Sequence, residues 1–238
     1  MEKETYFGVD VSPYNYEEII SDIKKRIDQK QTSTIIAVNP EKVMTAEKNA
    51  ELKELINTAT YQIPDGIGIL LASKLKGGQI RSRVTGVDMM DRLLQFAQEH
   101  NQGVFMYGAK DEVVKSAAEN IKSKYPGIHI AGVQNGYVQD ANKVVKEIND
   151  SKATILFVAM GSPRQELWIR EHMSELNTLV YQGVGGSFDV FAGHVKRAPK
   201  FFRQLGIEWL YRLLKEPKRL KRQLALPKFL LRVLTSKK

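Results

Sequence analysis

A lone carboxylate, Asp65, stands in the turn Pro64-Asp65-Gly66, and its residue type and setting could support chemistry. The turn separates a short apolar strand from the apolar start of an expected helix, a place where loops of α/β folds often carry functional residues. Asp65 is therefore a candidate catalytic residue. An Asp before a helix is also a common N-cap that accepts backbone N–H bonds, and both interpretations stay open.

Two arginines follow in the link that leads to the next expected helix, at about 89–100. Arg81 and Arg83 precede a helix N-terminus, where guanidinium groups could hold phosphate through charge-assisted hydrogen bonds. The alternative is a solvated basic loop, which suits Arg81 better than Arg83. Asp88, near the start of that helix, is most simply a cap.

Three polar residues lie in segments that follow expected strands, where ligands collect in open α/β sheets. They are Asn39, Gln165 and Asp189. Asn39 could instead bond its own turn, Gln165 could be a helix-start capping partner, and Asp189 could be a turn residue.

Glycines also follow the expected strands. Gly108 and Gly161 lie between a strand and a helix, where backbone N–H groups can receive phosphate. Gly185 and Gly186 belong to a glycine-rich run that permits close approach of a ligand. None of these segments reads GxGxxG or GxxxxGK[ST], so a dinucleotide fingerprint or a P-loop is poorly supported, and ordinary turns are the alternative.

The elements that must position these residues alternate regularly along the chain. Apolar strands are expected at 34–38, 61–63, 104–107, 128–133, 153–159 and 179–181, with helical segments between them. This alternation predicts an α/β fold with a Rossmann-like, mainly parallel sheet flanked by helices.

The composition excludes several classes of site. The 238 residues include no cysteine, and the four histidines share no metal-ligand spacing. There is no DxD, HExxH or G-x-S-x-G motif, so we expect no metal, no cofactor and no serine nucleophile. The charged N-terminus does not resemble a signal peptide, and no apolar run reaches 18 residues, so a cytoplasmic location is expected.

The basic residues are concentrated at the C-terminus. Residues 196–238 contain 14 Lys/Arg and 2 Asp/Glu, a charge of +12, whereas the whole chain carries +9. We therefore expect two parts, a catalytic α/β domain at 1–195 and a helical, basic, amphipathic appendage at 196–238.

The apolar and cationic character of this appendage favours a peripheral position on an anionic membrane. Nucleic-acid binding and a helix docked on the sheet are the alternatives, but the segment is too rich in Leu and Phe for a solvated basic arm. Self-association could also cover its apolar surface. Arg212, Arg219 and Arg222 could bring several guanidinium groups to one diphosphate.

Taken together, the motifs resemble the WecG/TagA/CpsF glycosyltransferase family over about residues 5–230. The segments that carry the resemblance are 39–41, 64–68, 83–88, 161–166, 183–189, 195–199 and 205–219. Many relatives have Thr where this chain has Ala37, so a hydroxyl contact to the donor sugar is missing.

The resemblance implies an inverting transferase that moves N-acetylmannosamine from UDP-ManNAc to polyprenyl-diphosphate-linked GlcNAc. The β-1,4-linked product begins the wall teichoic acid linkage unit, on the inner face of the cell membrane. By similarity, Asp65 is the general base and Arg83 supports the leaving diphosphate. Asn39 and Gln165 hold the donor sugar, and Asp189 with its glycines lies in the nucleotide region.

The resemblance also assigns the three appendage arginines to the acceptor side. One alternative is a transferase of the same family that uses another UDP-sugar, UDP-ManNAcA or a UDP-hexose, for a capsule or exopolysaccharide. A second alternative, from another class, is a noncatalytic, membrane-associated nucleotide-binding protein.

Overall fold

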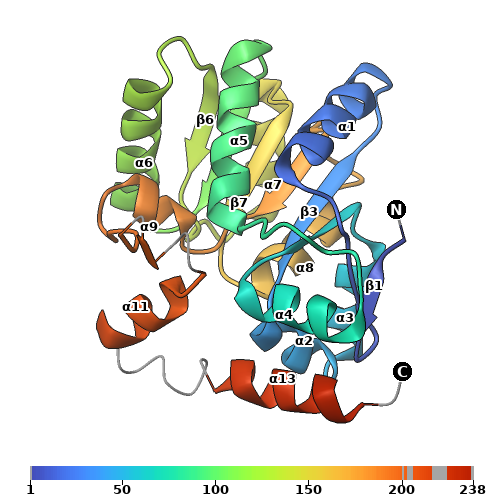
Figure 1. The fold of residues 1–238 in the computed structure, drawn as a ribbon. Helices are drawn as coiled ribbons and strands as arrows, with labels where there is room; N and C mark the ends of the chain where they lie inside the picture. Colours follow the sequence, from blue (N-terminus) through green and yellow to red (C-terminus); the bar gives the residue numbers. More distant parts are fainter. Residues whose placement is uncertain (1, 200, 203–205, 216–223, 237–238) are drawn as a thin grey trace.

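The computed structural model describes residues 2–199, 201–202, 206–215 and 224–236, and a six-stranded parallel sheet forms its centre (Figure 1). The strands stand in the order β4-β3-β8-β7-β5-β6, and every pairing is parallel. Their bounds are β3 (Ser33–Val38), β4 (Tyr61–Pro64), β5 (Val104–Gly108), β6 (Ile130–Gln134), β7 (Ile155–Ala159) and β8 (Val180–Gly183). The predicted Rossmann-like α/β class is confirmed.

The central strands are apolar on both faces because helices cover both sides of the sheet. Every residue of β5 and of β7 is buried, whereas the edge strand β6 is half-exposed throughout. Continuous apolar runs of this kind are typical of parallel strands.

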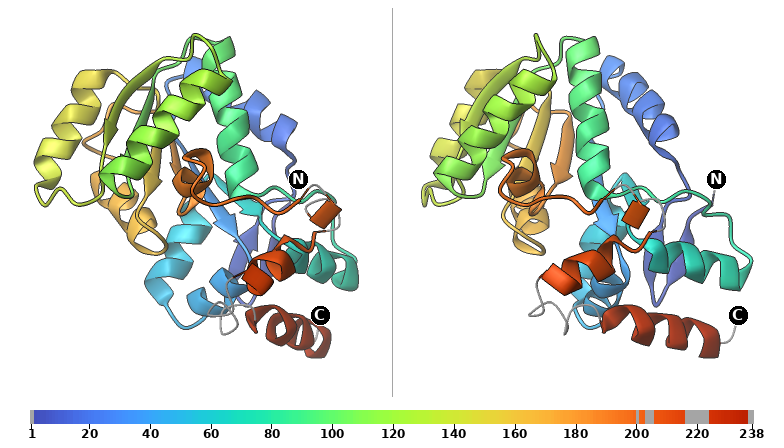
Figure 2. Two further views of the ribbon diagram at one scale, coloured as in Figure 1. Left: turned by 90° about the vertical axis from the view of Figure 1, so that its left-hand side faces the viewer. Right: turned by 60° about the vertical axis from the view of Figure 1, so that its left-hand side comes forward.

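Two helical layers sandwich the sheet (Figure 2). On one face, α1 (Tyr16–Asp28), α5 (Gly86–Glu99), α6 (Asp111–Lys124) and the short α9 (Ser187–Phe191) share the larger apolar core. On the other face, α7 (Ala141–Ser151) and α8 (Arg164–His172) cover β5, β7 and β8, while α2 (Pro40–Ala46), α3 (Ala50–Thr58) and α4 (Ile67–Lys76) form a separate core beside β3.

An N-terminal hairpin, which the sequence did not lead us to expect, belongs to this last core. Strands β1 (Glu4–Tyr6) and β2 (Val9–Val11) pair antiparallel. Phe7 and Gly8 join them with φ of 52° and 80°, the positive values that a two-residue hairpin turn requires. Three-residue strands give too short an alternation to be recognised in a sequence.

The C-terminal region forms two described helices, α11 (Glu208–Lys215) and α13 (Ala225–Thr235). Helix α13 packs on α2 and α4, with Phe229 and Val233 fully buried. Its Arg232 pairs with Glu47 of the segment after α2, at 2.6 Å between Nη2 and Oε1. None of the helices in the described ranges has the length and apolar character needed to cross a bilayer.

Candidate functional site

A cavity of about 570 Å³ opens at the carboxyl ends of β3, β4, β7 and β8, the edge where parallel sheets bind ligands. The sequence-predicted residues that line it are Asn39, Asp65, Arg83, Gly161, Gln165, Gly185, Gly186 and Asp189. The fold therefore brings together in one place residues that are up to 150 positions apart in the chain.

Asp65 lies directly after β4, where its backbone N–H donates to Val38 O at 2.8 Å and continues the β3–β4 pairing. Gly66 then takes φ of 95° and is itself the N-cap residue of α4. A positive φ of this size favours glycine, so the turn depends on Gly66. Asp65 is thus not the N-cap of this helix, and it lines the cavity instead.

Arg83 reaches the cavity from the link between α4 and α5. The next residues fix this link, since Val84 N–H donates to Pro64 O at 3.0 Å and Thr85 N–H donates to the Tyr16 hydroxyl at 2.8 Å. Arg81 instead donates to the carbonyl of Gly78 at 2.8 Å. The two arginines therefore differ in position, with Arg83 at the cavity wall.

Asn39 caps α2, because its Oδ1 accepts from Lys42 N–H at 2.9 Å. The interpretation that it bonds its own turn is therefore correct, and the residue also lines the cavity. Since the capping bond uses Oδ1, the Nδ2 amide is the group that can donate to a ligand.

Gln165 lies in the first turn of α8 and is only 4% exposed. Its Oε1 accepts from Gly185 N–H at 3.0 Å, and its Nε2 donates to Glu166 Oε1 at 3.1 Å. The side chain therefore connects α8 to the loop after β8, and Pro163 is the N-cap residue of the helix.

The loop after β8 forms the opposite wall of the cavity. Gly185 takes φ of 51°, and the Ser187 hydroxyl donates to Val184 O at 2.7 Å, which closes the turn into α9. Asp189 follows in α9 and lines the cavity, as does Gly186. Their roles toward a nucleotide stay a prediction.

Gly108 is placed differently from the other predicted glycines. It ends β5 with φ of 118°, and a Cβ there would lie 2.4 Å from the carbonyl oxygen of Ala159 in β7. Close approach of two strands thus explains the glycine, which is not among the described residues that line the cavity.

The three appendage arginines are only partly within the described chain. Arg212 belongs to α11, but its side chain lies outside the described residues, as do Arg219 and Arg222 entirely. Their role at the acceptor diphosphate stays a prediction. Helix α13 does reach the cavity, because Ala225 and Leu226 line it.

Sequence reasoning missed a buried ion pair at the cavity. Lys42 Nζ lies 2.7 Å from Glu166 Oε1, and the two side chains are 11% and 2% exposed. Lys42 lines the cavity. Acidic residues are common in the first turn of a helix because they interact favourably with the helix dipole, so Glu166 did not stand out in the sequence.

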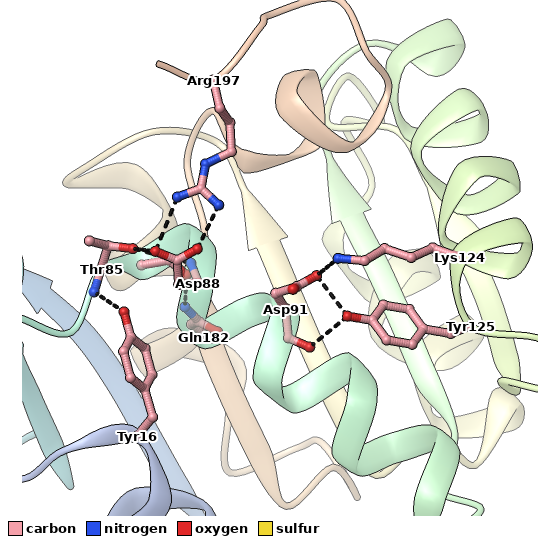
Figure 3. A network of polar contacts seen from close by, with 9 residues as sticks. Tyr16, Thr85, Asp88, Asp91, Lys124, Tyr125, Gln182 and Arg197 are labelled. Atoms are coloured by element: carbon pink, nitrogen blue, oxygen red, sulfur yellow. Dashed lines mark hydrogen bonds and ion pairs between the residues drawn. The ribbon is translucent and has the colours of Figure 1, made fainter. Parts of the chain in front are cut away.

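The start of α5 forms a further part of the wall and is held from several sides (Figure 3). Asp88 accepts from the Thr85 hydroxyl at 2.7 Å and from both terminal nitrogens of Arg197, at 2.6 and 3.0 Å. Gln182 of β8 donates to Gly86 O at 2.8 Å. Because Arg197 follows α9, this pairing also secures the segment that brings Val195 to the cavity.

The cavity combines positive and negative side chains. Lys42 and Arg83 supply cations, while Glu41, Asp65, Asp189 and Glu208 supply carboxylates. Within the described part of the chain, no group of three or more acidic or histidine side chains is placed to hold a metal ion. The arrangement can therefore bind a phosphorylated ligand through Lys and Arg while presenting a carboxylate to a hydroxyl.

Comparison with known proteins gives a consistent match. The family model described as glycosyl transferase WecG/TagA/CpsF matches residues 4–238. A protein of Bacillus subtilis (strain 168), named N-acetylglucosaminyldiphosphoundecaprenol N-acetyl-beta-D-mannosaminyltransferase, is 39% identical over 239 residues, covering 100% of this chain and 93% of the relative. A protein of the same name from Bacillus spizizenii (strain ATCC 23059 / NRRL B-14472 / W23) is 41% identical over 208 residues, covering 87% of this chain and 81% of the relative.

Proposed function

The chain belongs to the WecG/TagA/CpsF family of glycosyltransferases, and from this premise we propose that it transfers N-acetylmannosamine from UDP-ManNAc to polyprenyl-diphosphate-linked GlcNAc. The product is the β-1,4-linked disaccharide of the wall teichoic acid linkage unit. The names of the two relatives, which match the chain over most of its length, support this choice of acceptor and sugar. The observation that carries the proposal is the cavity that gathers Asp65, Arg83, Asn39 and Gln165.

The reaction we propose is a single displacement with inversion. Asp65 takes the proton from the attacking hydroxyl of the acceptor sugar, and the bond between the anomeric carbon and the UDP oxygen breaks on the opposite face. Arg83 stabilises the negative charge that develops on departing UDP. Asn39 and Gln165 hold the donor sugar, while Asp189, Gly185 and Gly186 contact the nucleotide.

In this proposal, cationic side chains stabilise the departing UDP, so the reaction needs no metal cofactor. Arg83 and Lys42 both line the cavity. We expect turnover to be unchanged after dialysis against EDTA, measured with a matched sample that is resupplied with Mg²⁺. A loss of activity that Mg²⁺ restores would contradict this part of the proposal.

A panel of radiolabelled UDP-sugars, incubated with the lipid-diphosphate-GlcNAc acceptor, tests the function directly. We expect transfer from UDP-ManNAc. Transfer from UDP-ManNAcA or a UDP-hexose alone would favour the alternative within the family, and UDP-sugar binding without transfer would favour a noncatalytic nucleotide-binding protein. Because Ala37 lines the cavity, the same panel on Ala37→Thr shows whether a hydroxyl there changes the preferred sugar.

We further propose that the protein is peripheral on the inner face of the cell membrane, through the surface around α13. Leu231 and Leu234 on this helix are 63% and 61% exposed, and Leu71 and Leu75 lie exposed on α4, against which α13 packs. The other end of α13 reaches the cavity, so a membrane on this surface would lie beside the site. Such a position suits an acceptor that is anchored in lipid.

Sedimentation with anionic vesicles tests the membrane surface. The double variant Leu231→Ser/Leu234→Ser should bind vesicles more weakly, because it removes exposed apolar surface and leaves the buried Phe229 intact. Tyr137→Ser, 71% exposed in the segment between β6 and α7, is the matched control. Unchanged vesicle binding together with a smaller oligomer in light scattering would assign the surface to self-association.

A further inference from the structure

The buried side chains beside Gln165 form a chain of hydrogen bonds that runs from α2 to the loop after β8. Lys42 Nζ and Gln165 Nε2 both donate to Glu166 Oε1, at 2.7 and 3.1 Å. Gln165 Oε1 accepts from Gly185 N–H at 3.0 Å. Helix α2, helix α8 and the loop after β8 are therefore linked through the adjacent side chains of Glu166 and Gln165.

This arrangement determines which way the carboxamide of Gln165 faces. A backbone N–H can only donate, so the atom of Gln165 beside Gly185 must be the oxygen. An ionised carboxylate can only accept, so the atom beside Glu166 must be the NH₂ group. A flipped carboxamide would set donor against donor at Gly185 and acceptor against acceptor at Glu166.

We propose that Glu166 and Lys42 are positioning residues that make Gln165 a hydrogen-bond donor toward the UDP-sugar. The proposal rests on the proposed function, because it assumes that the donor substrate occupies this cavity. Nε2 and the Lys42 ammonium share one acceptor atom, so their remaining N–H groups lie close together at the cavity wall. The group that Gln165 Nε2 recognises is an oxygen acceptor of the UDP-sugar.

Gly183, which lies against the Gln165 carboxamide, is an independent observation that the placement of this side chain is constrained. A Cβ on Gly183 would lie 2.5 Å from Gln165 Nε2 and 2.9 Å from its Cδ, closer than real contacts allow. Gly183 is not in a conformation that requires glycine, since it is absent from the positive-φ residues of the described chain. Space for the Gln165 side chain thus accounts for the missing Cβ.

The local hydrogen bonding among the described residues satisfies only one oxygen of the Glu166 carboxylate. Glu166 Oε2 is buried and has no hydrogen-bond partner within the described residues. Burying a carboxylate oxygen without a partner costs free energy. A neutral replacement of the pair should therefore be tolerated by the fold, since buried ion pairs are often replaced without loss of stability.

Titration calorimetry with UDP-ManNAc and with UDP tests the proposal. We expect Lys42→Met and the double variant Lys42→Met/Glu166→Gln to weaken UDP-ManNAc binding about tenfold or more, the usual scale for losing a charge-assisted hydrogen bond. Glu166→Gln alone keeps an amide oxygen that can accept from Gln165, so its effect should be smaller. The melting temperature of the double variant should stay near that of the unaltered chain. Glu171→Gln, the same change at an exposed position of α8, is the control and should bind normally.

Two further variants act on Gln165 itself. Gln165→Glu keeps the shape but cannot donate, so it should bind no better than Gln165→Met. Gly183→Ala should weaken binding without touching the ion pair, which keeps the test valid if Glu166→Gln fails to fold. Donor affinity within about twofold of the unaltered chain for the double variant or for Gln165→Glu would overturn the proposal.

A comparison of UDP-ManNAc binding with UDP binding shows which part of the substrate carries the oxygen that Gln165 recognises. Weakened binding of UDP-ManNAc with normal binding of UDP places that oxygen on the sugar, and weakened binding of both places it on the diphosphate. Either result supports the donor orientation of Gln165. If the unaltered chain binds UDP-ManNAc but transfers no sugar, the proposed function fails while this inference stands.

Discussion

Two aspartates, Asp88 and Asp65, lie close to the start of a helix, but their surroundings in the structure differ. Asp88 stands in the first turn of α5 and accepts from the Thr85 hydroxyl and, through two bonds, from Arg197. Asp65 precedes α4, where glycine occupies the N-cap position, and it lines the cavity. Asp88 thus fixes the cavity wall, whereas Asp65 lines the cavity itself.

The difference teaches that the backbone of the turn, more than the residue type, distinguishes the candidate catalytic carboxylate. At α5 the chain has a hydroxyl residue, Thr85, at the N-cap and an acidic residue three positions later, a common capping pattern. At α4 the positive φ of Gly66 turns the chain before the helix begins. Asp65 is thereby left at the end of β4, where ligands bind in parallel sheets.

The charges of both carboxylates act on the pKa of Tyr16. Its hydroxyl accepts from Thr85 N–H, and burial raises its pKa, an effect to which the charges of Asp88 and Asp65 contribute in the same direction. The two aspartates are thus close enough to share an electrostatic environment while serving different purposes.

The largest expected effect comes from Asp65→Asn. The amide cannot accept the proton of the attacking hydroxyl, so we expect transfer to fall by at least about 10³-fold, while UDP-ManNAc still binds and the melting temperature is unchanged. Radiolabel transfer and calorimetry measure the two quantities. Near-normal turnover would remove Asp65 from the role of general base.

Arg83→Ala should come next. If the guanidinium stabilises charge on departing UDP, kcat should fall by about 10²-fold with a smaller change in KM, because the charge develops in the transition state. Arg81→Ala is the matched control, since Arg81 bonds the carbonyl of Gly78. An effect of Arg83→Ala confined to KM would indicate that it binds the ground state and the transition state equally.

Asp88→Asn should have the opposite effect to Asp65→Asn, lowering the stability of the fold more than the rate of transfer. Arg197 would lose its carboxylate partner in a partly buried place, with side chains 22% and 32% exposed. We expect a loss of about 2 kcal/mol, or about 4–8 °C in melting temperature, with a smaller fall in kcat than for Asp65→Asn. A greater fall in kcat than for Asp65→Asn, with stability unchanged, would overturn the comparison.

The smallest effect concerns Glu4, a third carboxylate that holds the segment leading to Arg83. Burial alone would raise its pKa, but bonds from Tyr6 and from the backbone of Ile80 and Gln79 outweigh burial and lower the pKa below 4.5. The stability that Glu4 contributes is therefore present above pH 4.5 and is lost as the pH falls through the lower folded value. Glu4→Gln should melt at a lower temperature than the unaltered chain at neutral pH, and this difference in melting temperature should shrink as the pH is lowered. Glu2→Gln, the control, should melt like the unaltered chain.

The sequence predicted the six sheet strands and the place where most of its candidate site residues meet, for one physical reason. Apolar runs identify buried strands, and the carboxyl ends of parallel strands share one edge, so Asn39, Asp65, Gln165 and Asp189 had to converge. The pairs Lys42–Glu166 and Asp88–Arg197 were not predicted, because they join residues 124 and 109 positions apart. Such contacts depend on how helices pack, which local patterns do not specify.

The docking of α13 has a consequence for the order in which the parts of the protein fold during synthesis. The ring of Phe229 contacts those of Tyr6 and Phe7, at centroid distances of 5.8 and 5.9 Å, so the last described helix completes a core that the first hairpin begins. During synthesis the N-terminal segments emerge first, and the packing of α2 and α4 beside Asn39 and Asp65 is completed only after α13 has emerged. Until α13 has left the ribosome, this layer therefore lacks the helix that covers it.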